Sequence, residues 1–470
     1  MCGIIITNIN NFDLNHINFF NKKRGPDLTN HKIIKGINFI HNLLHITGDI
    51  CPQPLIDNEI VCLFNGEIYN FKNFGDFKSD GECLIYLYKM YGDEFIKKLD
   101  GEFAIVLFDF SKNIILLSTD HFGTKPLWYS FNNNKFGISS YKSTLDRLKL
   151  NNNCQVENNI TLILDLHKLE IIKKLNNFNF ELKQYKNNFN DWNKAFDNAV
   201  LKRTLNTDKK ILLGLSSGHD SGTISCSLLK QNISHTPISI IGSEDLNILI
   251  ERKKLYKNIK FYQLNTKNIN ESKKYISKNA EKLIYIWQGG NPNYYSNDNK
   301  ILNGFTQDII NDPGAFGLSF IINKAKEIDK NIKIILSGIG GDEIYYSYGS
   351  SSSNKWNVKL YGSGLQPDYF PENLQEIYPW NNLYGNSMKN YISMNEIIGG
   401  AHGYETRYPF LDNDLFQEFL WLSPELKNKC FKSSLSNYMT VNNYPFKQNY
   451  KKGFNSVKIQ TDPLIKKLLN

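Results

Sequence analysis

The chain has 470 residues, a mass of 54.4 kDa and a formal net charge of +9, which leaves room for two or three domains at roughly 150 residues each. Hydrophobic residues make up 41% and charged residues 21%, a globular composition that argues against extensive disorder. No apolar run approaches the roughly 20 residues that cross a bilayer, and the lysines are scattered along the chain. We therefore expect no membrane and no nucleic-acid partner, and a weak positive field that attracts anionic substrates such as nucleotides.

The N-terminal segment begins Met1-Cys2-Gly3 and has no Lys or Arg ahead of its apolar stretch, so it lacks the charged region of a signal peptide. The 7 cysteines include no C-x-x-C pair, which argues against a zinc ribbon and against a disulfide scaffold. We expect a cytoplasmic protein with reduced thiols. Cys2 is the most suggestive of them, because removal of Met1 would leave a free α-amine beside the thiol as its base. The alternative is that Cys2 is a small apolar residue opening a buried strand.

Residues 1–170 are rich in predicted strands. The apolar residues of 82–90 share one face and predict a helix. Apolar runs at 103–108 and 114–117, joined by a polar turn, predict a hairpin, and 160–166 predicts another strand. The polar, Asn-rich stretch at 175–190 predicts a linker.

After the linker, the pattern changes to strands that alternate with helices. Strands are predicted at 210–215, 238–241, 259–264 and 332–336, and 224–229 predicts the beginning of a helix. This alternation is typical of a parallel α/β sheet. Ligands of such sheets bind beyond the carboxyl ends of the strands.

Two polar turns follow predicted strands of this sheet. The first, Leu215-Ser216-Ser217-Gly218-His219-Asp220-Ser221-Gly222, offers backbone N–H groups and small hydroxyls at a helix start, an arrangement that binds phosphate. Its alternative is a plain helix N-cap. The second, Ser337-Gly338-Ile339-Gly340-Gly341-Asp342-Glu343, also carries an acid. Because a carboxylate suits a phosphate site when it holds a divalent cation, Asp220 and Asp342 together predict a shared Mg²⁺–pyrophosphate site.

These two turns belong to a larger set of motifs that follow one another in a fixed order along the chain. On the strength of that set, the chain resembles the glutamine-dependent asparagine synthetases over nearly its whole length. The further motifs are Met1-Cys2-Gly3-Ile4, Arg24-Gly25-Pro26-Asp27, Asn65-Gly66-Glu67-Ile68-Tyr69-Asn70, Ser79-Asp80-Gly81-Glu82, Asp120-His121-Phe122-Gly123 and Gly403-Tyr404-Glu405-Thr406-Arg407-Tyr408-Pro409-Phe410-Leu411-Asp412.

The resemblance implies an N-terminal αββα sandwich at 2–175, a glutaminase with an N-terminal nucleophile, followed by an α/β parallel-sheet ATP-pyrophosphatase domain at 190–470. It implies that Cys2 attacks the side-chain amide of glutamine. Asn65 and Gly66 would form the oxyanion hole that acyl transfer requires. Glutamine would be bound by Asn65, Gly66, Glu67 and Asp80, of which Asp80 would hold its α-amino group.

For the second domain, the resemblance implies that ammonia arrives through an apolar channel and meets a carboxylate activated by ATP. The implied ATP-binding residues are Leu215, Ser216, Ser217, Gly218, Asp220, Ser221, Ile241, Ser337 and Gly338, and the implied Mg²⁺ ligands are Asp220 and Asp342. A lysine near the C-terminus would stabilise the charge on the reacting phosphate, and its spacing to Gly453 favours Lys451. The alternative for that stretch is a solvated basic segment.

The sequence departs from the family pattern at three positions, Ser217, Leu43 and Ile339. Ser217 replaces a glycine of the phosphate loop. Leu43 stands where an arginine usually binds the α-carboxylate of glutamine, and His45 is a conceivable substitute or a structural residue. Ile339 stands where a glutamate usually steers the attacking amine, and Glu405 is a candidate for that duty or a partner for Arg407.

The expected function is the ATP- and Mg²⁺-dependent amidation of aspartate to asparagine with ammonia from glutamine, releasing AMP and pyrophosphate. One alternative is a synthetase that forms another amide or a lactam with weak or no glutaminase activity. Another is a non-catalytic scaffold that retains the fold. The expected small-molecule partners are glutamine, ATP and a carboxylate, and a homodimer is a candidate assembly.

Overall fold

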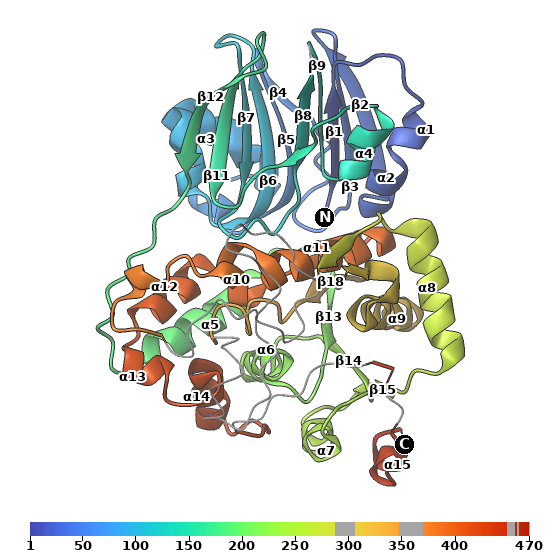
Figure 1. Cartoon of the computed structure of the whole chain (residues 1–470), viewed down its shortest axis with the longest axis vertical. Coiled ribbons are helices and arrows are strands. Elements are labelled where there is room, and N and C mark those ends of the chain that lie inside the picture. The colour runs from blue at the N-terminus through green and yellow to red at the C-terminus, as the bar shows by residue number, and fades with distance from the viewer. Residues whose placement is uncertain (133, 287–305, 347–369, 449–455, 458–459, 470) are drawn as a thin grey trace.

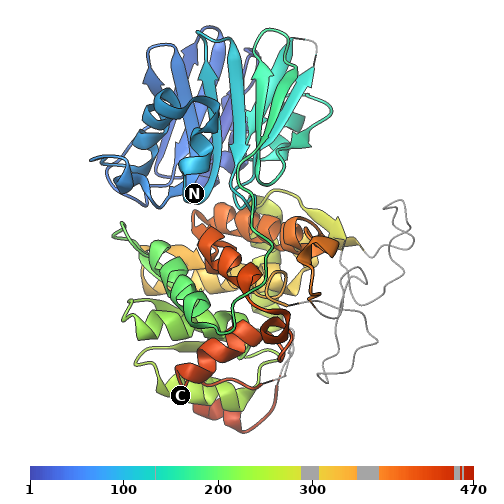
Figure 2. The ribbon, with the colours of Figure 1, turned by 90° about the vertical axis from the view of Figure 1, so that its left-hand side faces the viewer.

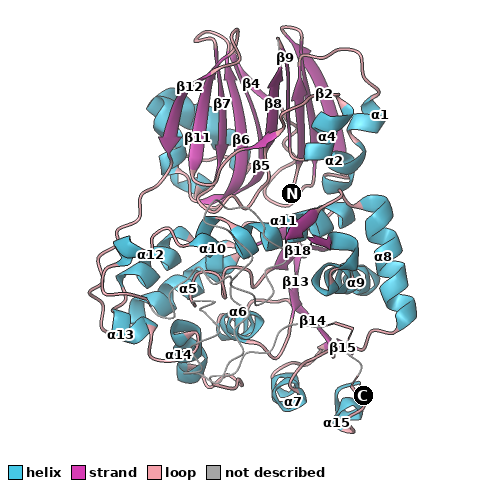
Figure 3. Cartoon of the chain, in the orientation of Figure 1, coloured by secondary structure: helices cyan, strands magenta, loops and turns pink. Residues whose placement is uncertain are grey.

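The computed structural model describes residues 1–132, 134–286, 306–346, 370–448, 456–457 and 460–469. The chain forms two halves that stack along the long axis, a strand-rich N-terminal half and a helix-rich C-terminal half (Figures 1 and 3). The N-terminus lies where the two halves meet (Figure 1). Within the described residues, no helix combines the length and apolarity that a bilayer crossing requires.

The N-terminal half contains two six-stranded antiparallel sheets, in the orders β10-β8-β9-β1-β3-β2 and β12-β11-β7-β6-β5-β4. The strands are β1 (Gly3–Thr7), β2 (Leu28–Ile34), β3 (Ile37–Leu43), β4 (Leu55–Asp57), β5 (Ile60–Ile68), β6 (Gly101–Asp109), β7 (Ile114–Thr119), β8 (Trp128–Asn132), β9 (Lys135–Ser139), β10 (Cys154–Gln155), β11 (Ile160–Asp165) and β12 (Ile171–Asn176). The helices of this half are α1 (Leu14–Ile17), α2 (Phe19–Arg24), α3 (Cys83–Tyr91) and α4 (Lys142–Arg147).

Strand β6 shows why the two sheets form a sandwich. Its alternate residues Ala104, Val106 and Phe108 join the apolar cluster between the sheets. The residues between them, including Ile105 and Leu107, join a second cluster that α3 covers. Both faces of the strand are therefore buried, which accounts for the uninterrupted apolar run in the sequence. The αββα expectation is confirmed.

The predicted elements of this half agree with the observed ones. The hairpin expected at 103–108 and 114–117 is the antiparallel pair β6–β7, and the helix and strand expected at 82–90 and 160–166 are α3 and β11. The predicted linker begins inside β12, which continues to Asn176. The sequence did not indicate this strand, because it is an exposed edge strand with little apolar patterning. The segment then crosses to the second half (Figure 2). The domain limits 2–175 and 190–470 stay predictions.

The C-terminal half contains a five-stranded parallel sheet in the order β15-β14-β13-β18-β19, as the alternating pattern predicted. The strands are β13 (Lys210–Gly214), β14 (Thr236–Ile240), β15 (Lys260–Tyr262), β18 (Ile332–Leu336) and β19 (Glu405–Arg407), with a separate pair β16 (Ile284–Ile286) and β17 (Thr306–Asp308). The helices are α5 (Asn190–Lys202), α6 (His219–Lys230), α7 (Leu246–Lys254), α8 (Thr266–Asn279), α9 (Pro313–Ile328), α10 (Asn381–Tyr384), α11 (Asn386–His402), α12 (Asn413–Trp421), α13 (Pro424–Lys427), α14 (Ser433–Val441) and α15 (Leu464–Leu469).

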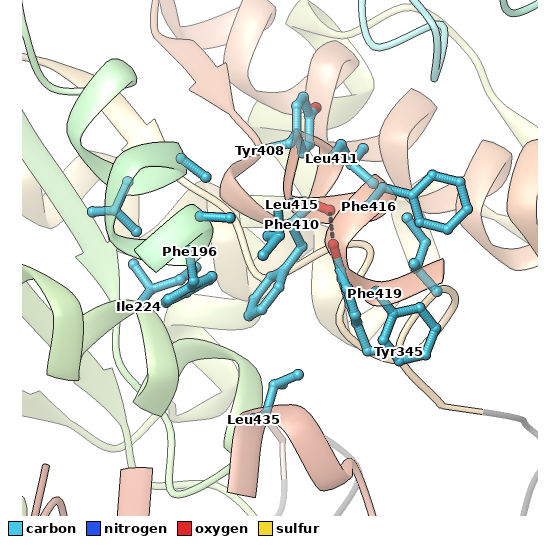
Figure 4. Packing of buried hydrophobic residues seen from close by; sticks show 14 of the residues in the cluster. Phe196, Ile224, Tyr345, Tyr408, Phe410, Leu411, Leu415, Phe416, Phe419 and Leu435 are labelled. Atoms are coloured by element: carbon cyan, nitrogen blue, oxygen red, sulfur yellow. Dashed lines mark hydrogen bonds between the residues drawn. The ribbon is translucent and has the colours of Figure 1, made fainter. Parts of the chain in front are cut away.

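Apolar clusters cover both faces of the parallel sheet. On one face, residues of β13 and β18 pack with α5, α6, α12 and α14, and Met1 and Leu44 of the N-terminal half belong to the same cluster. Figure 4 shows part of it, with Phe410 and Phe419 packed against Tyr345, whose hydroxyl donates to the Phe410 carbonyl at 2.9 Å. The other face packs against α8, α9 and α11. The core of the second half therefore continues into the first.

Candidate active sites

Cys2 lies at the start of β1, where the two halves meet, and is buried. Its backbone N–H donates to Oδ1 of Asn65 on β5 at 2.7 Å, and its carbonyl accepts from Nε of Arg24 at 2.9 Å. Burial raises the pKa of the Cys2 thiol to about 11, although the nearby terminal ammonium acts to lower it. In this unprocessed form of the chain, the thiol is therefore uncharged at neutral pH and needs a base to become a nucleophile.

Asn65, which contacts Cys2, and the next residue Gly66 are the two residues predicted for the oxyanion hole. Nδ2 of Asn65 is buried and has no hydrogen-bond partner among the described residues. A buried donor without a partner costs free energy, so an unpaired one next to a nucleophile is typical of a site that receives an oxygen. Gly66 has a φ of +137°, and a Cβ there would lie 1.9 Å from the Glu102 carbonyl oxygen, so only glycine fits.

Glu67 and Asp80 complete the group around Cys2. Thr47 donates to Glu67 Oε2 at 2.6 Å, and Asp80 Oδ2 accepts from the Ile68 N–H at 2.9 Å. Burial raises the pKa of both carboxyls, that of Asp80 to about 6. The structure thus brings together Cys2 and every residue that the sequence assigned to glutamine.

Glu405, which the sequence offered as a base for the synthetase reaction, lies instead beside the N-terminus, where the two halves meet. Its Oε2 pairs with the α-ammonium of Met1, and its Oε1 accepts from Arg407 Nε at 2.7 Å. Burial acts to raise the pKa of Glu405, but the terminal ammonium and then Arg407 outweigh it and hold that pKa below its usual value. Arg407 Nη2 in turn lies 3.1 Å from Glu67 Oε1. The predicted partnership of Glu405 with Arg407 is therefore present.

Leu43 and His45 lie near this site at the end of β3. The His45 ring Nε2 is 2.7 Å from the Gly48 carbonyl oxygen, and its backbone N–H donates to Asp27 at 2.9 Å. The first contact is within the loop of His45 and the second ties that loop to the segment before β2, which agrees with the structural reading of His45. Leu43 is buried but belongs to no apolar cluster of the described residues.

The second candidate site lies at the carboxyl ends of three adjacent parallel strands. Leu215 follows β13, Ile241 follows β14 and Ser337 follows β18. These strands are neighbours in the order β14-β13-β18, so the turns after them meet at one edge of the sheet. Ser337 N donates to the Arg407 carbonyl at 2.9 Å, which joins β19 to the same edge.

Backbone N–H groups of the phosphate loop already have partners within the protein. Ser216 N donates to Ser221 Oγ at 3.0 Å, and Gly218 N donates to Ser216 Oγ at 3.1 Å. Ser217 N and Oγ both donate to Glu244 Oε2 at 2.5 Å. The hydroxyl that replaces the usual glycine is thus held by an acid after β14. A bound phosphate would compete with these internal contacts.

Asp220 and the second turn are in direct contact. A Cβ added at Gly341 would lie 2.2 Å from Asp220 Oδ1, and one at Gly338 would lie 2.8 Å from Asp220 Cβ. Glycines at both positions therefore let the turn close onto the first residues of α6. Gly340 has a φ of +97°, which also favours glycine.

Lys432 lies between the two predicted metal ligands. Its buried ammonium pairs with Asp220 and lies 2.7 Å from Asp342 Oδ1. Burial acts to lower the pKa of Lys432, but the two carboxylates, Asp220 first, outweigh it and raise that pKa. Two carboxylates that converge on one cation fit Mg²⁺ once phosphate oxygens complete its shell. No group of three or more His, Cys, Asp or Glu side chains in the described residues offers a metal site, so the nucleotide would have to supply ligands.

Arg252 binds backbone carbonyl groups of the phosphate loop. It is fully buried, and its Nη1 donates to the Ser216 carbonyl and, at 3.1 Å, to the Gly218 carbonyl. A Cβ at Gly222 would lie 2.3 Å from Arg252 Nη2, so that glycine makes room for the guanidinium. Neither Arg252 nor Lys432 lies in a motif that sequence reasoning could use. Glu244 follows a predicted strand of the same sheet, and that position could have indicated that it lies near the phosphate loop.

Two further positions that the sequence analysis singled out for this site are Ile339 and Lys451. Ile339 packs against the large apolar cluster, and its N–H donates to Ser337 Oγ at 3.4 Å. No carboxylate therefore stands at position 339 to meet an amine. Lys451 lies outside the described residues.

Buried ion pairs join the two halves. Arg24 Nη2 pairs with Glu396 Oε2 of α11 at 2.5 Å, and Lys125 Nζ pairs with Glu396 Oε1 at 3.1 Å. Arg203 of the second half pairs with Glu102 of the first at 2.7 Å. Removing one member of such a buried pair strands the other charge. Arg24 also donates to the Cys2 carbonyl, so its ion pair with Glu396 connects Cys2 to the second half.

Comparisons with known proteins show what the chain is similar to. A family model described as "Glutamine amidotransferase domain" matches residues 1–178. A Methanocaldococcus jannaschii protein named "Putative asparagine synthetase (glutamine-hydrolyzing) 1" is 28% identical over 452 residues, covering 89% of this chain and 74% of that protein. Proteins named "Asparagine synthetase (glutamine-hydrolyzing)" from Mesocricetus auratus and Homo sapiens are each 26% identical, covering 86% of this chain and 73% of the relative. The similarity therefore extends well beyond the segment that the family model matches.

Proposed function

The chain belongs to the family of glutamine-hydrolysing asparagine synthetases, and we propose that it uses glutamine nitrogen and ATP to amidate the side-chain carboxylate of aspartate. Proteins of this family combine a glutamine amidotransferase with a ligase. The observation that carries the proposal is the unpaired Asn65 Nδ2 beside Cys2, in a buried group of side chains that also includes Asp80. A scaffold protein has no physical need for this set of side chains.

In the proposed first reaction, the mature Cys2 attacks the side-chain amide carbon of glutamine. Its own α-amine takes the thiol proton, and Asn65 Nδ2 with the Gly66 N–H stabilises the oxyanion. The C–N bond then breaks, the amide nitrogen leaves as ammonia with that proton, and water hydrolyses the thioester to glutamate. Asp80 holds the α-ammonium of glutamine.

In the proposed second reaction, an oxygen of the aspartate carboxylate attacks the α-phosphate of ATP and pyrophosphate leaves. Ammonia then attacks the acyl carbon, AMP leaves, and the excess proton passes to solvent. The loop from Ser216 to Ser221 and the turn at Ser337 hold the nucleotide. Asp220 and Asp342 would hold Mg²⁺, which neutralises charge on the departing pyrophosphate when bound. Lys451 is the proposed catalytic lysine, and Leu215 and Ile241 are proposed to flank the nucleotide.

A second candidate is the amidation of a different carboxylate. It is favoured by Ile339, which packs against apolar residues where the family usually has a glutamate. Leu43 supports the same alternative, because it removes the usual cation for the glutamine α-carboxylate. Under this alternative, the adenylation site works while glutamine is used weakly.

The test is a measurement of glutamate, pyrophosphate and AMP with glutamine or ammonium chloride as donor and a panel of carboxylates as acceptor. The proposal predicts glutamate and asparagine in equal amounts with aspartate, and no glutamate formation by Cys2→Ala. Pyrophosphate release with another acid but not with aspartate would establish the second candidate. No pyrophosphate with any acid, together with no glutamate, would leave the scaffold alternative.

A further inference from the structure

We propose that Glu244 controls how phosphate groups bind to and leave the phosphate loop, because its carboxylate occupies the place of a phosphate oxygen when no nucleotide is bound. Mg²⁺–ATP binds as this carboxylate moves away, and the carboxylate returns as pyrophosphate leaves. This inference rests on the nucleotide site of the proposed function. It goes further by giving a role in the reaction to a residue outside the motifs of the sequence.

The first observation is how Glu244 contacts the phosphate loop. Its Oε2 accepts from both the backbone N–H and the hydroxyl of Ser217, each at 2.5 Å. Glu244 is 5% exposed and Ser217 is 7% exposed, so both are largely shielded from water. A backbone N–H and a small hydroxyl at a helix start are the donors that such loops offer to phosphate. One carboxylate oxygen therefore holds both donors that residue 217 would offer to a nucleotide.

The second observation is that the hydroxyl of Ser217 strengthens this contact. Besides donating to Glu244, Ser217 Oγ accepts from the Asp245 N–H at 2.9 Å. A glycine, the residue expected here from the family pattern, would keep only the backbone N–H. The serine thus adds two hydrogen bonds between the phosphate loop and the segment that follows β14.

The third observation is that the backbone is anchored on both sides of this contact. Gln460 Nε2 donates to the Gly242 carbonyl at 2.7 Å and to the Glu244 carbonyl at 3.0 Å. On the other side, Arg252 Nη1 donates to the carbonyls of the residues before and after Ser217. The side chain of Glu244 is therefore the part that has to move when a phosphate arrives.

The fourth observation is the negative charge around the loop. Asp220 and Asp342 lie at the same edge of the sheet, where Lys432 pairs with both. A phosphate bound at Ser217 with Glu244 still in place would put two anions within reach of one N–H, and like charges at such separations repel each other even in water. The carboxylate and the phosphate are therefore alternative occupants. It follows that Glu244 weakens the binding of the substrate ATP and of the product pyrophosphate alike.

The experiment measures the binding of Mg²⁺–ATP, and separately of pyrophosphate with magnesium chloride, to the full chain by titration calorimetry without any carboxylate acceptor. Glu244→Gln removes the charge of the competing group. We expect this variant to bind both ligands about tenfold more tightly, because a neutral amide competes less well than a carboxylate for an N–H donor. In the synthetase reaction, pyrophosphate should inhibit the variant at about a tenfold lower concentration.

Two further variants separate this role from a structural one. Ser217→Ala removes the hydroxyl and keeps the N–H, and should bind both ligands about threefold more tightly. In the double variant the two effects should not add, because both substitutions act on one contact. Glu251→Gln changes an exposed glutamate of α7 that pairs with Lys254, and should bind both ligands like the wild type. Thermal unfolding shows whether each variant keeps its fold.

The same titrations contain the results that would overturn the proposal. Unchanged binding by a folded Glu244→Gln would show that its carboxylate does not compete with phosphate, and weaker binding would show that it supports the nucleotide. Additive effects in the double variant would show that the two residues act separately. If the wild-type chain binds neither ligand, the nucleotide site of the proposed function fails, and this inference with it. Tighter binding by Glu244→Gln in a chain that makes no asparagine would support this inference and count against the aspartate assignment alone.

Discussion

The ammonium of Lys432 lies 2.7 Å from Asp342 Oδ1 and also pairs with Asp220, so one lysine links the turns that follow β13 and β18. Lys432 is 3% exposed and has a φ of +46°, an unusual backbone conformation for a residue other than glycine. The two carboxylates would repel each other without a cation. Lys432 therefore supplies the neutralising charge when no nucleotide is bound.

Lys432→Met should make the nucleotide-free protein dependent on magnesium. The variant removes the buried cation that pairs with both carboxylates, and we expect a loss of about 3 kcal/mol of folding free energy, the lower end for a broken buried pair. Magnesium chloride should restore more stability to the variant than to the wild type, because Mg²⁺ can take the vacated place. Thermal unfolding with magnesium chloride or with EDTA measures both effects.

The matched control for that experiment is Lys429→Met, which removes an exposed lysine of the same segment. It should unfold like the wild type in both solutions. Equal stability of Lys432→Met and wild type without magnesium would show that the ion pair contributes little.

Met1 should be protected from aminopeptidase in the folded protein. The residue is 1% exposed and its amine is paired with Glu405, so an enzyme that binds a free N-terminus cannot reach it. We expect a Met1-retaining preparation to keep Met1 when treated with methionine aminopeptidase in the native state, and to lose it after mild unfolding. Intact-mass measurement before and after treatment checks this. Equally fast removal from the folded chain would mean that the N-terminus opens readily.

The affinity for glutamine should depend on pH through Asp80. Burial raises the pKa of this carboxyl to about 6, and only its charged form pairs with the α-ammonium of glutamine. As pH falls through about 6, Asp80 becomes protonated, and KM for glutamine should rise by up to about tenfold per pH unit. Glutaminase kinetics over this range measure the effect. Asp80→Asn should have a high KM that does not vary there, and a flat wild-type profile would contradict the assignment.

Leu43→Arg should improve the use of glutamine. The substitution places a guanidinium where the family usually has one, and a charge-assisted pair with the α-carboxylate should lower KM for glutamine about tenfold. Leu43→Met is the control, since it adds length without charge and should leave KM near the wild-type value. Steady-state glutaminase assays compare the three proteins. An unchanged KM for Leu43→Arg would indicate that another cation already holds the carboxylate.

The sequence predicted the parts of the fold that depend on local pattern. The β6–β7 hairpin, helix α3 and the alternation that forms the parallel sheet all follow from the spacing of apolar residues along short segments. The ordered motifs likewise predicted the residues around Cys2. Strand β12 was partly missed, because its residues are mostly exposed and an edge strand gives little apolar signal.

The sequence by itself determined the two architectures and the resemblance to a family, because these follow from local patterns and from motifs within a few residues of one another, and it predicted candidate residues for each site. Only the tertiary structure decided that Lys432 lies between Asp220 and Asp342, that Arg252 supports the phosphate loop, and that Glu405 faces the amine of Met1. These contacts join residues that are far apart in the chain, and ion pairs at such separations leave no periodic or compositional signal. They exist only once the chain has folded and brought these distant residues together, within the second half for Lys432 and Arg252 and between the two halves for Glu405.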